Sequence, residues 1–98
     1  MLHMVVATHT PDNCPMVVLA LAKKLLAANQ RIGEVGKKLG VTPQGSWTDM
    51  PAHVTFMLVD APNAHVVNQM AMELKMMDWN TVVVYAVVTS QEAVATLK

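Results

Sequence analysis

The sequence predicts an α+β domain whose elements follow the order β-α-β-β-α-β. Three observations support this prediction. The chain has 98 residues, which suits a single domain. Two long segments repeat their apolar residues in steps of three and four, as amphipathic helices do. Shorter runs rich in β-branched and other apolar residues begin the chain, precede the second helical segment and follow it, which is typical of strands.

The first strand is predicted over residues 2–9, and residues 10–15 form a loop that leads into the first helix. Alternation along the strand places Leu2, Met4 and Val6 on one face. The opposite face then carries His3, Val5, Ala7 and His9. Asp12 or Asn13 could cap the helix, because both side chains accept hydrogen bonds from free N–H groups.

The first helix is predicted over residues 16–39 and ends at Gly40, which suits the left-handed position after a helix. One apolar seam should face the core: Val18, Leu21, Leu25, Ala28, Ile32, Val35 and Leu39. A second seam lies roughly 100° round the helix and consists of Leu19, Ala22, Leu26, Asn29, Gly33 and Gly36. A glycine inside a helix costs about 1 kcal/mol relative to alanine. We therefore expect a partner backbone to approach these two glycines.

The middle of the chain is predicted to form a hairpin. Residues 41–46 hold a proline and a glycine and should be mostly turn. A short second strand surrounds Trp47, and a tight turn at residues 49–52 leads to a third strand over residues 53–60. In that third strand, Val54, Phe56 and Leu58 share one face.

The last third of the chain predicts a helix, a strand and a short final helix. The second helix begins after residues 60–63 and ends at residues 78–80. Its inner seam is Val67, Met70, Leu74 and Met77. The fourth strand covers residues 81–88, and Thr89 with Glu92 has the spacing of a capping box that starts a C-terminal helix.

This order is the split βαβ, or ferredoxin-like, plan, with four antiparallel strands and both helices on one face of the sheet. Sheets with one face in water alternate apolar and polar residues. The third and fourth strands are apolar on both sides. We therefore expect another subunit to cover the second face, which would make this single domain, residues 1–98, a homo-oligomer.

The composition favours the same interpretation. Hydrophobic residues make up 53% of the chain and charged residues 14%, against usual values of about 45–50% and about 25%. Seven basic residues balance seven acidic ones without a basic stripe, so neither nucleic acid nor a membrane surface is an expected partner. With no bilayer-spanning run, no signal peptide and one cysteine, Cys14, we expect a cytoplasmic location.

Several stretches resemble the dimeric α+β-barrel group of small ferredoxin-like proteins, in the layout of its muconolactone-isomerase-like members. They are residues 45–47, residues 53–60, the helix through Met77, and residues 78–88. The resemblance implies that two sheets pack face to face and that small-molecule sites lie between a subunit's sheet and its helices. No catalytic residue of the isomerases matches a position here, and Ala86 stands where these families often have proline.

The second seam of the first helix suggests a further interface with another protein chain, formed by Leu19, Ala22, Leu26, Gly33 and Gly36. A natural exposed helix would carry charged residues at some of these positions. The seam therefore fits an engineered version of a natural oligomer, designed to form a larger symmetric assembly such as a protein cage. A natural oligomer contact through the same helix is the alternative.

Candidate catalytic residues lie in the loop after the first strand. His9 could activate the thiol of Cys14 as a nucleophile, with Asp12 orienting the histidine. The spacing matches no thiol-enzyme motif, and a lone cysteine before a helix is usually a packed residue. Zinc bound by His3, His9 and His53 is not expected, because His3 and His9 lie roughly 20 Å apart along a strand. No metal and no cofactor is predicted.

A second candidate group is a pocket between the sheet and the helices, lined by Trp47, His53, Phe56, Trp79 and Tyr85. Binding pockets are mostly apolar with a few polar groups. His53 and Tyr85 could serve as acid and base in an isomerisation. Ordinary packing explains the same five side chains.

The leading interpretation is a self-associating domain without assignable catalysis. The alternative is a small cofactor-free isomerase, or a related enzyme of the dimeric α+β-barrel type, acting through His53, Tyr85 and His9. The two differ in one observation. An enzyme should have an open, partly polar cavity near His53, whereas an assembly module should have that space filled and the second helix seam buried.

Overall fold

A computed structural model describes residues 1–97 and has one four-stranded antiparallel sheet with three helices. The strands are β1 (Leu2–Thr8), β2 (Thr42–Asp49), β3 (Val54–Asp60) and β4 (Thr81–Val87). The helices are α1 (Leu19–Leu39), α2 (Ala64–Glu73) and α3 (Ser90–Ala95), and two short 3-10 turns are η1 (Pro11–Asn13) and η2 (Met76–Asp78). The α+β class is confirmed, and the C-terminal helix makes the element order β-α-β-β-α-β-α.

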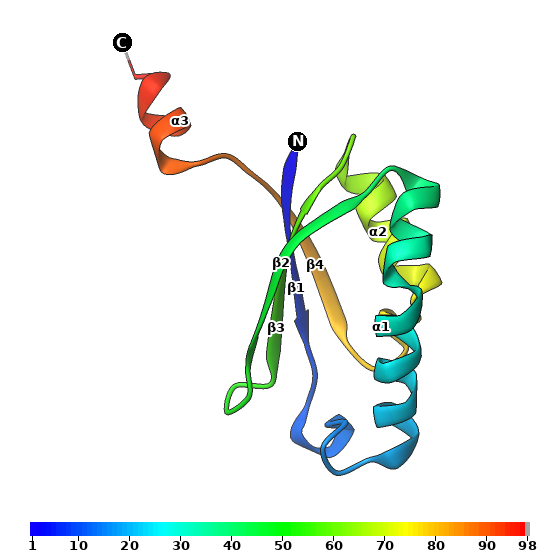
Figure 1. Cartoon of the computed structure of the whole chain (residues 1–98). Coiled ribbons are helices and arrows are strands. Elements are labelled where there is room, and N and C mark those ends of the chain that lie inside the picture. The colour runs from blue at the N-terminus through cyan, green and yellow to red at the C-terminus, as the bar shows by residue number, and fades with distance from the viewer. Residues whose placement is uncertain (98) are drawn as a thin grey trace.

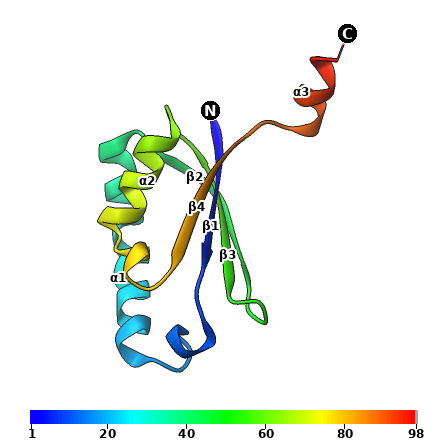
Figure 2. The same cartoon turned by 180° about the vertical axis from the view of Figure 1, so that it is seen from behind.

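The strands lie in the order β2-β3-β1-β4, so β1 is central and pairs antiparallel with β3 and β4. Helices α1 and α2 cover one face of the sheet and leave the other face bare (Figures 1 and 2). The core fills the space between sheet and helices. Its fully buried side chains are Val5, Val35, Val59, Val67 and Met70. The alternation predicted for the first and third strands is thereby confirmed.

Helix α1 begins at Leu19, later than predicted, and ends as predicted. Residues 15–17 form a turn in which the N–H groups of Val17 and Val18 donate to the carbonyl of Cys14, both at 3.0 Å. Neither Asp12 nor Asn13 caps the helix, because both belong to η1. At the other end Gly40 adopts φ 74°, the left-handed conformation expected of it.

The two glycines of the second seam differ. A Cβ atom on Gly36 would lie 2.6 Å from the carbonyl oxygen of Val41, and Gly36 is buried. The backbone that approaches it is therefore the chain's own turn after α1, which corrects its assignment to an interface. A Cβ on Gly33 would meet nothing within 4 Å. Leu19 and Leu26 are 72% and 62% exposed, so this part of the seam has no partner among residues 1–97.

Strand β2 is longer than predicted, since it begins at Thr42 in the segment expected to be turn. As the edge strand of the sheet it tolerates Pro43, and the register shifts between Pro43 and Gly45. The predicted hairpin turn is confirmed, with the carboxylate of Asp49 accepting from the N–H of Ala52 at 3.1 Å.

Helix α2 is capped by Asn63, whose side chain accepts from the N–H of Val66 at 3.0 Å. Val67, Met70 and Leu74 are buried as predicted. Met77 is 37% exposed, because the backbone leaves the helix before it, at left-handed Lys75 (φ 59°). The break thus comes earlier than residues 78–80.

Helix α3 begins at the predicted capping box, where the Thr89 hydroxyl accepts from the N–H of Glu92 at 3.0 Å. It stands apart from the rest of the fold, and all its residues are exposed (Figure 1). Within residues 1–97, none of the helices is long and apolar enough to cross a bilayer.

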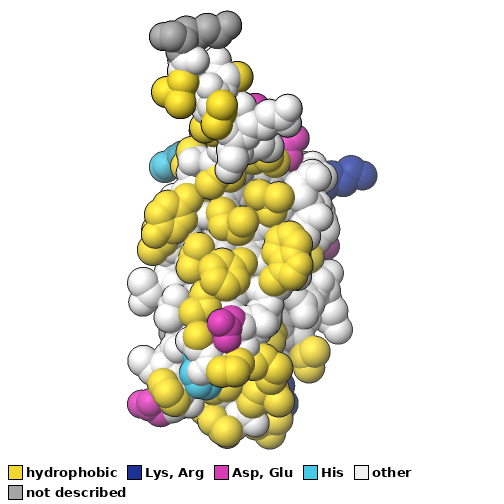
Figure 3. Space-filling model, turned by 90° about the vertical axis from the view of Figure 1, so that its left-hand side faces the viewer, with side chains coloured by type: hydrophobic (Ala, Val, Ile, Leu, Met, Phe, Trp, Pro, Cys, Tyr) yellow, Lys and Arg dark blue, Asp and Glu magenta, His cyan; other side chains and the backbone are white. Residues whose placement is uncertain are grey.

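The face of the sheet that no helix covers carries many apolar side chains (Figure 3). Trp47, Val83 and Tyr85 are 57%, 42% and 53% exposed. Phe56 lies opposite both Trp47 and Val6 in the strand register, which places it on this face as well. We call this surface, centred on these side chains, the outer face.

Candidate functional site

The unequal lengths of the two helices create a cavity at one end of the fold. Helix α1 has 21 residues and α2 has 10, which correspond to roughly 31 Å and 15 Å at 1.5 Å per residue. The N-terminal half of α1 therefore extends past α2. Beneath it lies a cavity of about 840 Å³. It lies on the side of the sheet opposite the outer face.

The cavity walls are mostly apolar. The first predicted seam of α1 contributes Leu25, Ala28 and Ile32, and the sheet contributes Ala7 and Met57. A minority of polar side chains also line it: His9, Asn29, Ser46, Thr48, His53, Thr55 and Asn80. No aspartate, glutamate, lysine or arginine is among the described lining residues. An uncharged apolar body would be buried here at little electrostatic cost, with a few positions for hydrogen bonds.

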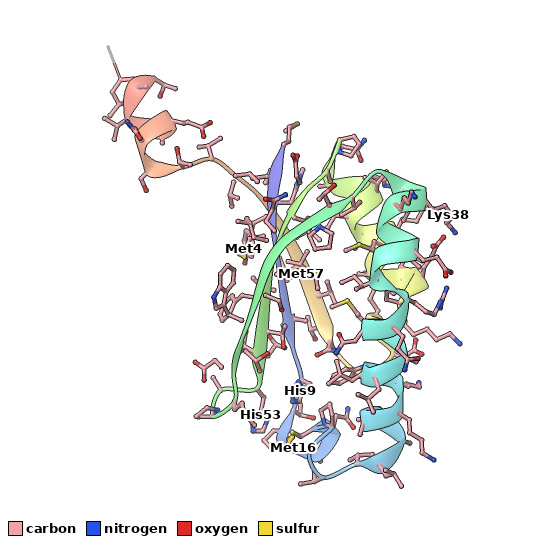
Figure 4. The ribbon with its side chains drawn as sticks, in the orientation of Figure 1. Met4, His9, Met16, Lys38, His53 and Met57 are labelled. Carbon is pink, nitrogen blue, oxygen red and sulfur yellow. The ribbon has the colours of Figure 1, made fainter. Side chains whose placement is uncertain are left out.

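Two histidines from different strands meet at this cavity (Figure 4). His9 follows β1 and His53 precedes β3, and these strands pair so that Thr8 lies opposite Val54. The backbone N–H of His9 accordingly donates to the carbonyl of His53 at 3.1 Å. The side chains also meet, with His53 Nδ1 and His9 Nε2 3.3 Å apart and the ring centroids 5.1 Å apart.

The backbone at His53 is unusual. Its φ is 56°, in the left-handed region that non-glycine residues seldom occupy, although asparagine, aspartate and histidine do so most often. Such conformations cost on the order of 1–3 kcal/mol and concentrate at functional sites. Here the conformation ends the hairpin turn, where the His53 N–H donates to the Met50 carbonyl at 3.2 Å.

Cys14 lies close to His9 and His53 and forms a group of three side chains with them. It follows η1 and is buried, and its carbonyl anchors the turn that leads into α1. Its Sγ and one ring nitrogen of each histidine all lie within 4.8 Å of one another. The predicted proximity of His9 and Cys14 is therefore present, but the third member is His53, whereas Asp12 is exposed on η1 outside the group.

The surroundings of His9 lower its pKa. Burial lowers the pKa of His9 below its ordinary value, and the nearby imidazole of His53 lowers it further. A hydrogen bond with the side chain of Asn80 acts in the opposite direction. Asn80 is itself fixed, since its Nδ2 donates to the Met76 carbonyl at 3.0 Å. The indole of Trp79 packs against the His9 ring at 5.3 Å between centroids.

The structure separates the five side chains predicted to line one pocket. His53 and Trp79 line the cavity. Trp47, Phe56 and Tyr85 lie on the outer face instead, because strand alternation points them away from the helices. His53 and Tyr85 are thus on opposite sides of the sheet and cannot act on one substrate within a single chain.

The other two histidines are remote from the cavity. His3 is buried, with Nδ1 3.2 Å from the Met1 carbonyl oxygen, and His65 is exposed on α2. Sequence reasoning missed Asn29 and Asn80 as cavity residues. It also did not join His53 to Cys14, although the pairing of the first and third strands brings His53 beside His9 and so to the loop that holds Cys14.

Comparison with known proteins identifies one family. The sequence pattern of the family described as "Domain of unknown function (DUF3303)" matches residues 1–98. No curated protein matches the chain.

Proposed function

The chain belongs to the DUF3303 family of domains of unknown function, and we propose from its geometry that it binds a small, largely apolar organic molecule in the cavity between its sheet and α1. The observation that carries this proposal is the cavity itself. Its volume of about 840 Å³ falls within the roughly 300–1,000 Å³ typical of small-molecule sites. The open space lies beside His53, where the enzyme alternative requires it.

The site also offers a means of proton transfer. His9 and His53 are adjacent at the cavity, and imidazole rings are the commonest groups that transfer protons in enzymes. A cofactor-free isomerase-like reaction would use these two rings without Tyr85. The resemblance to dimeric α+β barrels, in which small molecules bind between sheet and helices, supports the same location.

The experiment is a binding screen with a cavity-filled variant as reference. Ala28→Phe places a large ring in the cavity, whereas Ala20→Phe adds the same ring to an exposed position of α1. A panel of small aromatic and aliphatic carboxylic acids, phenols and lactones is tested by thermal shift and calorimetry. We expect compounds that bind the wild type and Ala20→Phe but not Ala28→Phe. If every compound that binds also binds Ala28→Phe equally well, the cavity is not the site.

A second function, self-association through the outer face, rests on a separate observation. Monomeric proteins seldom expose an apolar patch larger than a few hundred Å², yet this face exposes Trp47, Phe56, Val83 and Tyr85 together. We infer that a second copy of the chain covers it, sheet against sheet, as in the dimeric α+β barrels. Both proposed functions are compatible, because the cavity lies on the opposite side of the sheet.

The oligomeric state distinguishes this interface from the predicted contact through α1. Phe56→Asp places a charge at the centre of the outer face, whereas the double variant Leu26→Glu, Gly33→Arg charges the helix seam. We expect light scattering to give an oligomer for the wild type and a monomer for Phe56→Asp with unchanged circular dichroism. A smaller assembly only in the helix variant would assign the interface to α1, and a monomeric wild type would exclude both contacts.

A further inference from the structure

Three metal-ligating side chains from three separate segments converge at the cavity. His9 comes from the end of β1, Cys14 from the loop after η1, and His53 from the turn before β3. Their ligand atoms lie within 4.8 Å of one another. Sequence spacing alone does not reveal this group, because 38 positions separate Cys14 from His53 in the sequence but the β1–β3 pairing brings them together.

The two ring nitrogens already have the separation that a shared metal ion requires. Zinc binds histidine nitrogen at about 2.0–2.1 Å in tetrahedral geometry, so two such nitrogens lie about 3.4 Å apart. His53 Nδ1 and His9 Nε2 are 3.3 Å apart. A zinc-bound thiolate sulfur would lie about 3.6 Å from each nitrogen, given a Zn–S bond of about 2.3 Å. The Cys14 Sγ lies within 4.8 Å of a ring nitrogen of each histidine, so it would move closer on binding the ion.

The surroundings hold the ligands in place as metal sites require. The Trp79 indole packs against the His9 ring, with 5.3 Å between the ring centroids. The backbone hydrogen bond from the N–H of His9 to the carbonyl of His53 fixes the two residues relative to each other.

The donor set narrows the kind of metal. One thiolate with two imidazoles suits zinc and also copper, whereas magnesium and calcium require oxygen ligands. We propose that His9 Nε2, His53 Nδ1 and Cys14 Sγ bind one Zn²⁺ ion, with the fourth coordination position directed to the cavity. Three protein ligands and an open position are the pattern of catalytic rather than structural zinc. A thiolate, two neutral imidazoles and Zn²⁺ leave one positive charge.

The charge of this site specifies the cavity ligand further. Because the cavity has no charged lining residue among those described, an anionic donor such as a carboxylate would neutralise the site by taking the fourth position. The ligand class is then a small molecule with an apolar body and one carboxylate. This last step rests on the proposed cavity binding, whereas the metal site does not. With both rings bound to zinc, the cofactor-free proton transfer described above would not operate.

The test uses the full chain, freed of metal with a chelator and titrated with Co²⁺ as a spectroscopic substitute for Zn²⁺. We expect one ion per chain, visible bands of a four-coordinate site, a thiolate-to-cobalt charge-transfer band, and displacement of Co²⁺ by Zn²⁺. Cys14→Ser should abolish the charge-transfer band. His53→Asn keeps a residue that tolerates positive φ and should weaken binding by at least about tenfold.

Matched variants separate loss of the metal site from loss of the fold. His65→Asn removes an exposed histidine and should bind Co²⁺ like the wild type. Thermal unfolding and circular dichroism establish that each variant is folded. Absence of the charge-transfer band in the wild type, or unchanged affinity in folded His53→Asn, would overturn the zinc site.

The inference that the cavity ligand carries a carboxylate is tested with octanoate. Ala28→Phe changes no metal ligand, so it should retain Co²⁺ while losing octanoate binding. Co²⁺ binding without any carboxylate binding would leave the metal site standing and refute the carboxylate as the ligand group. The proposed cavity binding fails only if no phenol or lactone binds either.

Discussion

The two ends of the space between sheet and helices are built from the same elements but differ in how they are filled. At one end α1 and α2 lie together over the sheet, and Val35, Val59 and Met70 are fully buried. At the other end α1 continues alone, and its seam lines an open cavity beside His9 and His53. The comparison shows that one apolar helix seam can serve as core over half its length and as a cavity wall over the other half.

The comparison also explains why apolar periodicity alone does not locate the site. A seam that lines a small-molecule cavity needs the same apolar residues, at the same helical steps, as a seam that packs against a core. What distinguishes the two ends is the length of α2, which ends at Glu73 before it can cover the cavity. The position of the cavity therefore depends on where a neighbouring helix stops.

The largest expected difference between the two ends is in stability. Met70→Ala removes a fully buried side chain and should lower the free energy of unfolding by about 2–5 kcal/mol. Leu25→Ala, at a position 39% exposed on the cavity wall, should cost about 1 kcal/mol or less. Urea denaturation of the two variants measures this difference. Equal losses would mean that the cavity end is packed as tightly as the core.

Substituting either of the two glycines of α1 by alanine should change the stability by a smaller amount, and in opposite directions at the two positions. Gly36→Ala would place its Cβ 2.6 Å from a backbone oxygen and should destabilise the chain by about 1–3 kcal/mol. Gly33→Ala meets open space and should stabilise the helix by about 0.5–1 kcal/mol. Thermal unfolding of both variants is the measurement. Destabilisation by Gly33→Ala would indicate that a partner chain does approach this glycine, as the second seam predicts.

The smallest expected effect on stability comes from an ion pair at the end of the fold that both α1 and α2 cover. There the N-terminal amine of Met1 lies 2.7 Å from the Asp60 carboxylate. A hydrogen bond from that amine, and then its charge, lower the pKa of Asp60. A lowered pKa in the folded state means that the ion pair stabilises the fold above the unfolded pKa of about 3.9, and that this contribution is lost as the pH falls.

Asp60→Asn should therefore slightly lower the melting temperature at neutral pH and leave it unchanged in acid, since both partners are exposed. Melting curves at several pH values check the direction. A difference from the wild type that grows as the pH falls would contradict this assignment.

Sequence patterns are sufficient where local physics decides the structure. Alternation in the first and third strands, the left-handed end of α1 at Gly40 and the cap at Thr89 all follow from neighbouring residues. The start of α1 and the strand character of residues 42–46 do not, because they depend on the loop at Cys14 and on pairing with β3.

The candidate site requires the tertiary structure for the same reason. The sequence singles out His9 with Cys14, and separately His9 with His53, but never all three together. Only the register between β1 and β3 shows that they share one place. Conversely, Tyr85 has the right chemistry for an acid or base, and its position in the alternation of β4 puts it on the wrong side of the sheet.

The most direct test of the central claim, that the open end binds a small molecule, is a heteronuclear NMR titration with the carboxylic acid that binds the wild type most tightly. Backbone amide shifts should change at Ala28, His53 and Asn80, which line the cavity, and remain constant at Val59 and Val67 in the closed core. Changes confined to the outer face, at Trp47 and Tyr85, would contradict the account and place the ligand on the interaction surface instead.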